Sequence, residues 1–317
     1  MIITFTGFMN ETNKSNRAIA LASAMCSLTK GTKTLVLQLC EKDVEPVEHI
    51  LTGVQDVKAF VDKGLTFTNE GIDGLLRVVD TMKLNKEDFD QMCLSLRKEN
   101  RLDIAEMTKN SMFVNSIPSK LDSIKQILRN ATEVYDDIFV LLPSKNEEVI
   151  KEINELEIVD RCVYCMNQGT IEKGNVYGYN PVVLLMDYDE DSMYTLRHLR
   201  SAMKLGKHVV TRKIRYSTKA KDAALSGQLL GFIAQNRDLD QDDTNYYWLK
   251  DVKEMLADLL GVPEGHLEPD YAFEKLNPVL NPNAPVDEET MLQIEKMANV
   301  SAKEKESFFK KAFAKKK

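Results

Sequence analysis

Short apolar runs alternate with amphipathic segments along most of this chain, and this alternation restricts its fold more than any other feature. The chain opens on an apolar, β-branched run at 1–7, continues with apolar residues at helical spacing over 14–28, and then has a nearly continuous apolar run at 34–40. A strand that is apolar on both faces is typical of a parallel sheet covered by helices on both sides. The first forty residues therefore predict one strand–helix–strand unit.

The same alternation continues to about residue 262. Further strands are expected at 102–107, 137–143, 159–166, 182–186 and 208–214. Helical segments are expected within 47–61 and at 86–99, 120–130, 147–155, 192–204, 220–225 and 248–260. Strands and helices that alternate in this way predict an α/β protein with a doubly wound, mostly parallel sheet flanked by helices.

Beyond this region the texture of the sequence changes. Five prolines punctuate 263–287, which predicts an extended linker after a domain at 1–262. The segment 288–317 contains two helical candidates and ends in a lysine-rich, basic amphipathic tail. We therefore expect one α/β domain with a C-terminal extension.

Composition excludes several classes of protein. The net charge is −7, so no overall field attracts nucleic acid, and nucleic-acid binding is not expected. No apolar run is long enough to span a bilayer, and no signal peptide is recognisable, which predicts a cytoplasmic protein or one peripheral to the inner face of a membrane. The four histidines are scattered and predict neither catalysis nor metal binding.

The cysteines predict no metal or redox site. Cys162 and Cys165 have C-x-x-C spacing, but no second pair completes a zinc site, and the two lie in a strand-like run instead of at a helix start. We interpret them as structural residues and assign no metal.

The loop after the first expected strand carries the chemistry of greatest interest. It reads Gly7-Phe-Met-Asn-Glu-Thr-Asn-Lys-Ser15, close to the phosphate-binding pattern G-x-x-x-x-G-K-[ST] but one residue longer, with Asn13 in place of the second glycine. Asparagine tolerates positive φ best among non-glycine residues, so Asn13 is expected to make the turn. Gly7, Asn13, Lys14 and Ser15 are thus the candidate phosphate ligands. The alternative is that Ser15 merely caps the helix and Lys14 is solvated.

Three neighbouring segments strengthen this interpretation. The fragment 18–39 resembles the small-residue helix, Gly-Lys turn and strand that follow the loop in the MinD/ParA family of SIMIBI-class P-loop NTPases. The segments 135–143 and 214–227 resemble that family's second acidic strand and its last strand with the adenine-binding loop. The resemblance covers about residues 1–262 and is most similar to degenerate members linked to secretion or pilus machines, such as TadZ. It implies ATP or ADP as ligands and a homodimer as the assembly.

The departures from the family pattern bear on activity. The place of the family's signature lysine falls at Phe8 or Met9, and the two acidic positions hold Gln38 and Leu141. Magnesium needs hard oxygen ligands, and phosphoryl transfer needs a group that orients the attacking water. We therefore expect no tightly held Mg²⁺, no catalytic residue and little or no hydrolysis. An active ATPase that recruits other carboxylates remains the alternative.

Two more sites are weighed near the end of the domain. The resemblance makes Arg215, Tyr216 and Ser217 candidates for the adenine site, although an ordinary strand–helix loop is the interpretation we favour. An acidic cluster at 187–191 follows a strand, on the side of the sheet where α/β proteins bind ligands. A docking site is conceivable there, but a solvated loop with helix-capping chemistry is preferred.

The C-terminal tail has a pattern of its own. Residues 301–317 contain seven lysines and two glutamates, and a helix would place Phe308, Phe309 and Phe313 on one face, away from Lys310 and Lys311. Basic amphipathic helices of this kind bind anionic membrane interfaces or partner grooves, and MinD-like proteins also end in one. The alternative is a solvated lysine tail whose phenylalanines pack back on the domain.

These observations lead to one functional hypothesis with two alternatives. We expect a degenerate MinD/ParA-like protein that positions or assembles a bacterial membrane-associated machine of the pilus or secretion type. The first alternative is an active ATPase of the same fold, and the second is a nucleic-acid-binding partition protein. The acidic balance of the chain and the absence of a basic stripe within the domain argue against the second.

Overall fold

The computed structural model of the chain describes residues 1–8, 11–29, 32–39, 44–52, 71–97, 101–106, 119–170, 176–263 and 267. The elements below all belong to one compact unit, Met1–Val54 together with Phe67–Tyr271. The predicted linker and tail, apart from Pro263 and Leu267, lie outside the described residues.

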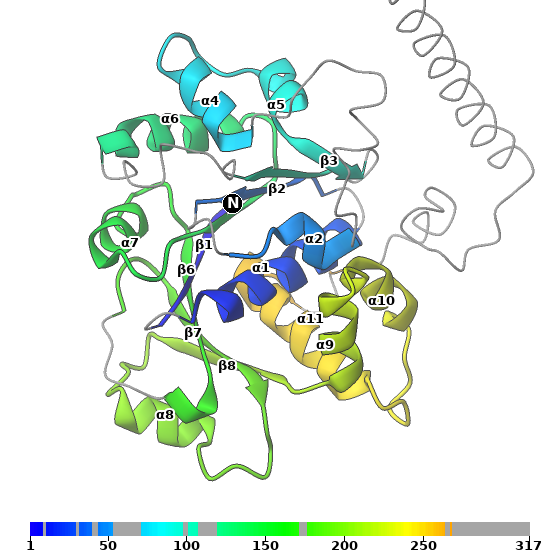
Figure 1. Cartoon of the computed structure of the whole chain (residues 1–317). Coiled ribbons are helices and arrows are strands. Elements are labelled where there is room, and N and C mark those ends of the chain that lie inside the picture. The colour runs from blue at the N-terminus through cyan, green and yellow to red at the C-terminus, as the bar shows by residue number, and fades with distance from the viewer. Residues whose placement is uncertain are drawn as a thin grey trace, which may run out of the picture. The chain divides into compact units, whose positions relative to one another are not determined.

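The described strands form one eight-stranded sheet, which lies between two groups of helices in Figure 1. The strands are β1 (Ile2–Gly7), β2 (Thr34–Gln38), β3 (Leu94–Arg97), β4 (Leu102–Glu106), β5 (Asp137–Leu141), β6 (Arg161–Met166), β7 (Pro181–Tyr188) and β8 (Val210–Arg215). Their order across the sheet is β3-β4-β2-β5-β1-β6-β7-β8, and every neighbouring pair is parallel except β3 with β4. The predicted α/β class with a mostly parallel sheet is confirmed.

Helices cover both faces of this sheet. The helical elements are α1 (Thr12–Ser27), α2 (Val47–Thr52), α4 (Gly71–Val79), α5 (Lys86–Met92), α6 (Leu121–Ala131), α7 (Glu147–Asn154), the 3-10 turn η2 (Gln168–Thr170), α8 (Leu196–Ala202), α9 (Thr218–Leu225), α10 (Leu229–Asn236) and α11 (Tyr246–Leu260). Side chains of α4, α5, α6, α7 and α8 share one hydrophobic core against one face of the sheet. α1 and α11 lie side by side on the other face, with α2, α9 and α10 beside them (Figure 1).

The burial of α1 explains its composition. It packs on β1, β5 and β6 from one side and on α10 and α11 from the other. Ala18, Ala20, Ala22 and Ala24 are completely buried, as small side chains must be where a helix is enclosed by neighbours at close range. Beneath it, Phe5 of β1 meets Phe139 of β5 edge to face, with ring centroids 5.8 Å apart. The first turn of α1 is therefore held firmly at the carboxyl end of the sheet.

Three elements depart from the sequence-based expectations. The helix expected over 86–99 ends at Met92, and the chain continues as the antiparallel edge strand β3. Asn85 and Asp88 form a capping box at the start of α5, whereas Ser95 is exposed and Leu96 is buried, the alternation of a half-covered strand. Helices α4 and α10 have no counterpart among the expected elements, and α10 buries Leu229, Leu230 and Ile233.

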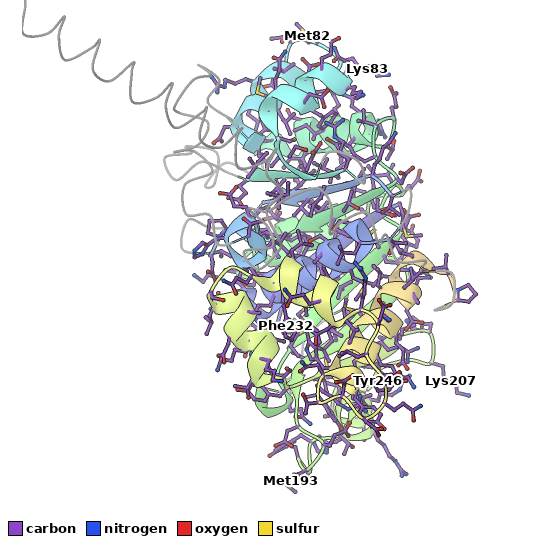
Figure 2. The ribbon with its side chains drawn as sticks, turned by 90° about the vertical axis from the view of Figure 1, so that its right-hand side faces the viewer. Met82, Lys83, Met193, Lys207, Phe232 and Tyr246 are labelled. Atoms are coloured by element: carbon purple, nitrogen blue, oxygen red, sulfur yellow. The ribbon has the colours of Figure 1, made fainter. Side chains whose placement is uncertain are left out.

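Large apolar side chains that reach the surface are dispersed. Met82 and Met193, the former 60% and the latter 80% exposed, point away from opposite ends of the domain (Figure 2). Exposed apolar residues that are scattered singly are normal on a protein surface, so these two do not mark a binding face. Within the described part of the chain, no helix is long and apolar enough to cross a membrane.

Candidate functional site

The carboxyl ends of the central strands position the candidate site. β1 lies between β5 and β6, and the chain leaves β1 into α1 on one face of the sheet but leaves β5 into α7 on the other. In open α/β sheets, ligands bind where neighbouring strands send their connections to opposite faces. Here the hydroxyls of Thr12, at the start of α1, and Ser144, in the β5–α7 loop, form a hydrogen bond across this point.

Gly7 makes a close approach between strand and helix possible. A Cβ atom at this position would lie 2.4 Å from both the carbonyl carbon and the carbonyl oxygen of Glu11, and 2.9 Å from the Thr12 nitrogen. In a phosphate cradle, glycine leaves room for the backbone to approach the phosphate. In this protein the room beside Gly7 is filled by the chain's own backbone.

Several N–H groups that a phosphate would need donate hydrogen bonds within the protein. The Phe8 N–H donates to the Cys165 carbonyl at 3.0 Å, and the Glu11 N–H donates to the Phe8 carbonyl at 2.8 Å. The Lys14 N–H donates to the Glu11 carbonyl at 2.9 Å. Anion binding at a helix start depends on N–H groups that point at the ligand, so this segment does not present the described donors as a cradle.

The expected turn at Asn13 is wrong. Among the described residues, the non-glycine residues with positive φ are Asn180, Asp187 and Lys204, whereas Asn13 is an exposed residue inside α1. α1 begins at Thr12, so Asn13 lies inside the helix and does not make the positive-φ turn.

Ser15 does not cap the helix, and its hydroxyl proton is donated within the helix and not to a ligand. The cap position belongs to Glu11, whose side chain makes no capping hydrogen bond and instead accepts from Asn167 Nδ2 at 3.1 and 3.2 Å. Ser15 is completely buried, and its hydroxyl donates to the Thr12 carbonyl at 2.9 Å. This i to i−3 bond is common for serine inside helices and keeps the hydroxyl on the helix backbone.

Lys14 is bound to a carboxylate of its own chain instead of being solvated. Its Nζ forms an ion pair with Asp187 Oδ2, and Arg17 Nη1 lies 3.0 Å from the same oxygen. Asp187 stands at the end of β7 with φ of 54°. Burial raises the pKa of its carboxyl, but Arg17 and Lys14 outweigh burial and hold that pKa below its usual range. One of the two positive charges that would meet a phosphate is thus already neutralised.

The two positions where the family pattern has acids are occupied by structural side chains. Gln38 is buried, its Oε1 accepts from the Val47 N–H at 3.0 Å, and its Nε2 donates to the Glu45 carbonyl at 3.3 Å. Leu141 is completely buried in β5. The one oxygen of Gln38 is thus engaged with the backbone and Leu141 has none in its side chain, so neither residue offers the carboxylate that magnesium prefers. No cluster of three or more metal-ligating side chains occurs among the described residues.

An aromatic ring lies where the resemblance would place the signature lysine. Phe8 is buried, and its ring packs against Tyr164 with centroids 5.2 Å apart. Met9, the other candidate for that place, lies outside the described residues. Taken together with the filled room beside Gly7, the described residues do not fit a magnesium–nucleotide complex as they stand.

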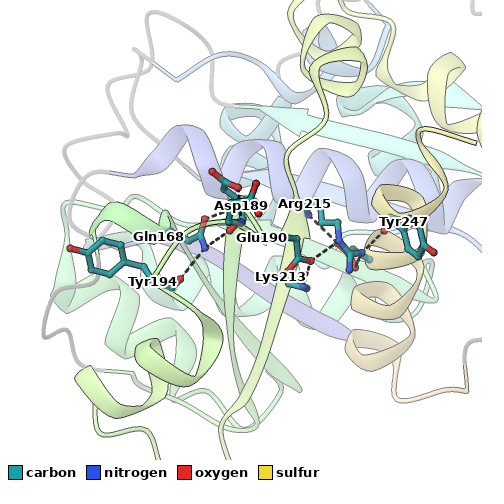
Figure 3. Close-up of polar contacts among 9 residues, drawn as sticks. Gln168, Asp189, Glu190, Tyr194, Lys213, Arg215 and Tyr247 are labelled. Carbon is teal, nitrogen blue, oxygen red and sulfur yellow. Dashed lines mark hydrogen bonds and ion pairs between the residues drawn. The ribbon is translucent and has the colours of Figure 1, made fainter.

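A polar network joins η2, the loop after β7 and the end of β8 (Figure 3). The Gln168 amide donates to the carbonyls of Asp189 and Tyr194 at 3.0 and 2.9 Å and accepts from the Asp189 N–H at 2.7 Å. Glu190 faces Lys213 and Arg215 in the same view. The acidic cluster is therefore tied down by specific partners. Helix capping, which was expected of it, is provided instead by Thr195, which accepts from the His198 N–H.

The three predicted adenine-site residues have different environments. The Arg215 side chain is held by Glu190 Oε1 at 2.8 Å and Asp251 Oδ1 at 2.7 Å. Ser217 caps α9 by accepting from the Ala220 N–H at 3.2 Å. Tyr216 is 48% exposed, so its ring is accessible for stacking. Arg215 and Ser217 thus have structural tasks, in keeping with the ordinary loop that the sequence favoured.

The cysteines and the tail complete the list of predicted sites. Cys162 and Cys165 are buried free thiols three residues apart in β6, so they face opposite sides of the sheet and cannot share a metal. Burial raises the pKa of the Cys162 thiol to about 11. The structural interpretation of this pair agrees with both facts. Phe308, Phe309, Lys310, Lys311 and Phe313 lie outside the described residues.

Comparisons with known proteins identify the fold. The described architecture matches a ParA family ATPase from Chlorobium tepidum TLS with a TM-score of 0.56 and 13% identity, covering 79% of this chain and 96% of that one. It also matches the septum site-determining protein MinD complexed with Mg-ADP from Pyrococcus horikoshii OT3, with a TM-score of 0.52 and 16% identity over 82% and 97% of the two chains.

A third structure belongs to the same group. The MinC:MinD cell division protein complex of Aquifex aeolicus matches with a TM-score of 0.51 and 12% identity, covering 83% of this chain and 96% of that one. No family model and no curated protein matches the sequence. The chain therefore has the fold of MinD/ParA-like P-loop ATPases, as the sequence predicted.

Sequence reasoning missed the partnership of Lys14 and Arg17 with Asp187. Asp187 was placed in the acidic cluster, at the ligand-binding edge of the sheet, but 170 residues or more separate it from its two partners. The available signal was its position at the carboxyl end of a strand close to β1 in a doubly wound sheet, which is where the first turn of α1 also lies.

Proposed function

We propose that this protein is a MinD/ParA-like positioning or assembly factor that works without magnesium-dependent ATP hydrolysis. The fold supports the general class. The observation that carries the second half of the proposal is the state of Lys14, which is ion-paired with Asp187 beside a loop in which the Phe8, Glu11 and Lys14 N–H groups donate within the protein. Gln38 and Leu141, at the two acidic positions, supply neither a carboxylate for magnesium nor a group that orients water.

Nucleotide binding enters the proposal in a restricted form. ATP or ADP would use Lys14 at the start of α1 and could stack the adenine on Tyr216, but it would first have to displace Asp187. Such binding would change the structure of the protein without hydrolysis of the nucleotide. Magnesium would not be tightly held.

The setting that we propose is a bacterial membrane-associated machine of the pilus or secretion type, as for TadZ-like proteins. The basic amphipathic pattern of 301–317 supports attachment to an anionic membrane surface or to a machine protein. A homodimer is proposed because two copies of a short helix attach far more firmly than one. The net charge of −7 argues against nucleic acid as the partner.

The first experiment measures ATP turnover. Purified protein with ATP and magnesium should release phosphate no faster than the Lys14→Ala variant, because Gln38 and Leu141 stand where the family has carboxylates. An active ATPase of the MinD/ParA type assayed in parallel shows that the conditions support turnover. A rate well above background that Lys14→Ala abolishes would overturn the proposal and favour the active ATPase.

A further inference from the structure

We propose that Asp187 is an internal competitor for the anion site, an autoinhibitory contact that keeps phosphate-bearing ligands away from Lys14 and Arg17. The inference rests on the proposed function only in that it concerns the same loop and helix. It assigns a cause to the poor fit of that loop to a nucleotide and names the residue that controls it.

The geometry of the contact resembles that of a bound anion. One carboxylate oxygen, Asp187 Oδ2, receives both the Lys14 ammonium and the Arg17 guanidinium, which lie one turn apart on α1. All three side chains are largely buried, with 18% to 23% of their surface exposed. Charge-assisted hydrogen bonds to a shared oxygen are what such a pair would offer to a phosphate oxygen.

The backbone at Asp187 departs from regular strand geometry. Its φ of 54° lies in the left-handed region, which costs free energy for a residue with a Cβ atom, although aspartate tolerates it better than most. The pairing register between β7 and β8 also shifts between Leu185 and Tyr188, so a local irregularity lies where Asp187 leaves the sheet. Irregularities of this kind redirect a side chain.

The segment after Asp187 is held separately. Gln168 binds both backbone groups of Asp189 and the carbonyl of Tyr194, which fixes the β7–α8 loop against η2 (Figure 3). Asp187 thus lies between the paired part of β7 on one side and the loop residues bound by Gln168 on the other. A ligand that takes over Lys14 and Arg17 must move the Asp187 carboxylate aside against this support.

Charges around the contact indicate the ligand class. Once the Asp187 carboxylate is displaced, Lys14 and Arg17 supply two positive charges, and the described carboxylate on the loop, Glu11, is hydrogen-bonded to Asn167. A polyphosphate, with several oxygens of high charge, matches a lysine and an arginine better than a single carboxylate does. The expected ligands are thus pyrophosphate and the phosphate chain of a nucleotide.

The test compares Asp187→Asn with Asp189→Asn by titration calorimetry, using inorganic pyrophosphate and ATP separately in magnesium-free buffer of low ionic strength. Asparagine keeps the size and the tolerance of positive φ but removes the competing charge. Asp189 is exposed and is the matched control for lost negative charge. We expect Asp187→Asn to bind both probes about tenfold or more tightly than the natural sequence, a typical size for coupling between contacts, while Asp189→Asn is unchanged.

Two double variants, Asp187→Asn with Lys14→Ala and with Arg17→Ala, should each lose the gain. Circular dichroism checks that the variants are folded, and Asp187→Gly, which suits the positive φ, replaces Asp187→Asn if the latter unfolds. The inference is overturned if neither Asp187 variant binds more tightly than the natural sequence, or if the gain survives loss of Lys14 and Arg17. Turnover of ATP by the natural sequence would instead contradict the proposed function and leave this result standing.

Discussion

At the scale of single residues, Gly7 decides how the strand and the helix meet. Its missing side chain lets the Glu11 carbonyl and the Thr12 nitrogen approach to distances that no Cβ atom tolerates. The contact is with backbone atoms, which cannot rotate aside as a flexible side chain can. Gly7 therefore has a structural reason for being glycine that is independent of any phosphate.

A substitution tests this reason. Gly7→Ala should lower the free energy of unfolding by about 1–3 kcal/mol, the usual cost of overpacking a tight site, and urea denaturation would measure it. Gly169→Ala is the matched control, because a Cβ atom there would have no neighbour within 4 Å. Equal midpoints for the two variants would show that the start of α1 can relax away from β1.

At the scale of elements, the β8–α9 connection shows how a capping residue can imitate a binding residue. Ser217 has extended backbone angles and accepts from the Ala220 N–H, which is the geometry of an N-cap. The preceding Arg215 binds Asp251 of α11 through its side chain and its backbone N–H. Both residues stabilise the packing of β8 against the helices that follow it.

We expect Ser217→Ala to cost about 1 kcal/mol of stability, as loss of a serine cap generally does. Ser217→Asp retains a capping oxygen and should be close to the natural sequence in its thermal midpoint. Neither change should alter the calorimetric response to ATP of the Asp187→Asn protein. If ATP binding is lost while pyrophosphate binding is kept, Ser217 contacts the nucleoside part of ATP and belongs to the adenine site.

At the scale of the whole molecule, the domain and the C-terminal segment carry opposite charge. The chain as a whole has a net charge of −7, whereas residues 301–317 have five more lysines than glutamates. Attraction of lysines to an anionic surface contributes roughly 1 kcal/mol for each residue near the surface and weakens with salt. The tail could therefore direct an acidic protein to an acidic membrane.

The full-length protein should sediment with vesicles that contain phosphatidylglycerol at low salt, and less so as salt is raised. Deletion of 301–317 should abolish this binding, and Phe309→Glu should reduce it sharply because it places a charge on the predicted apolar face. A phenylalanine of the domain such as Phe232 cannot serve as the matched substitution, because it packs on Trp248 and its loss would affect folding. Vesicles of neutral lipid provide the control. If the variant that lacks 301–317 binds vesicles as well as the full-length protein, the membrane-binding surface lies elsewhere in the protein.

The sequence by itself determined the architecture of the domain. Apolar β-branched runs and amphipathic helices alternate with local periods that report burial directly, so the parallel sheet and most of its helices were predictable. The 86–99 segment was not, because a capping box starts a helix there but pairing with β4, a tertiary contact, turns its second half into β3.

Only the tertiary structure decided the state of the candidate site. The motif at 7–15 fixes which groups stand near the start of α1, but not where their hydrogen bonds go. The bond from the Phe8 N–H to the Cys165 carbonyl and the ion pair between Lys14 and Asp187 join residues that different strands bring together. Local sequence cannot report such contacts, because the energy of an ion pair depends on distance and burial in space and not on separation along the chain.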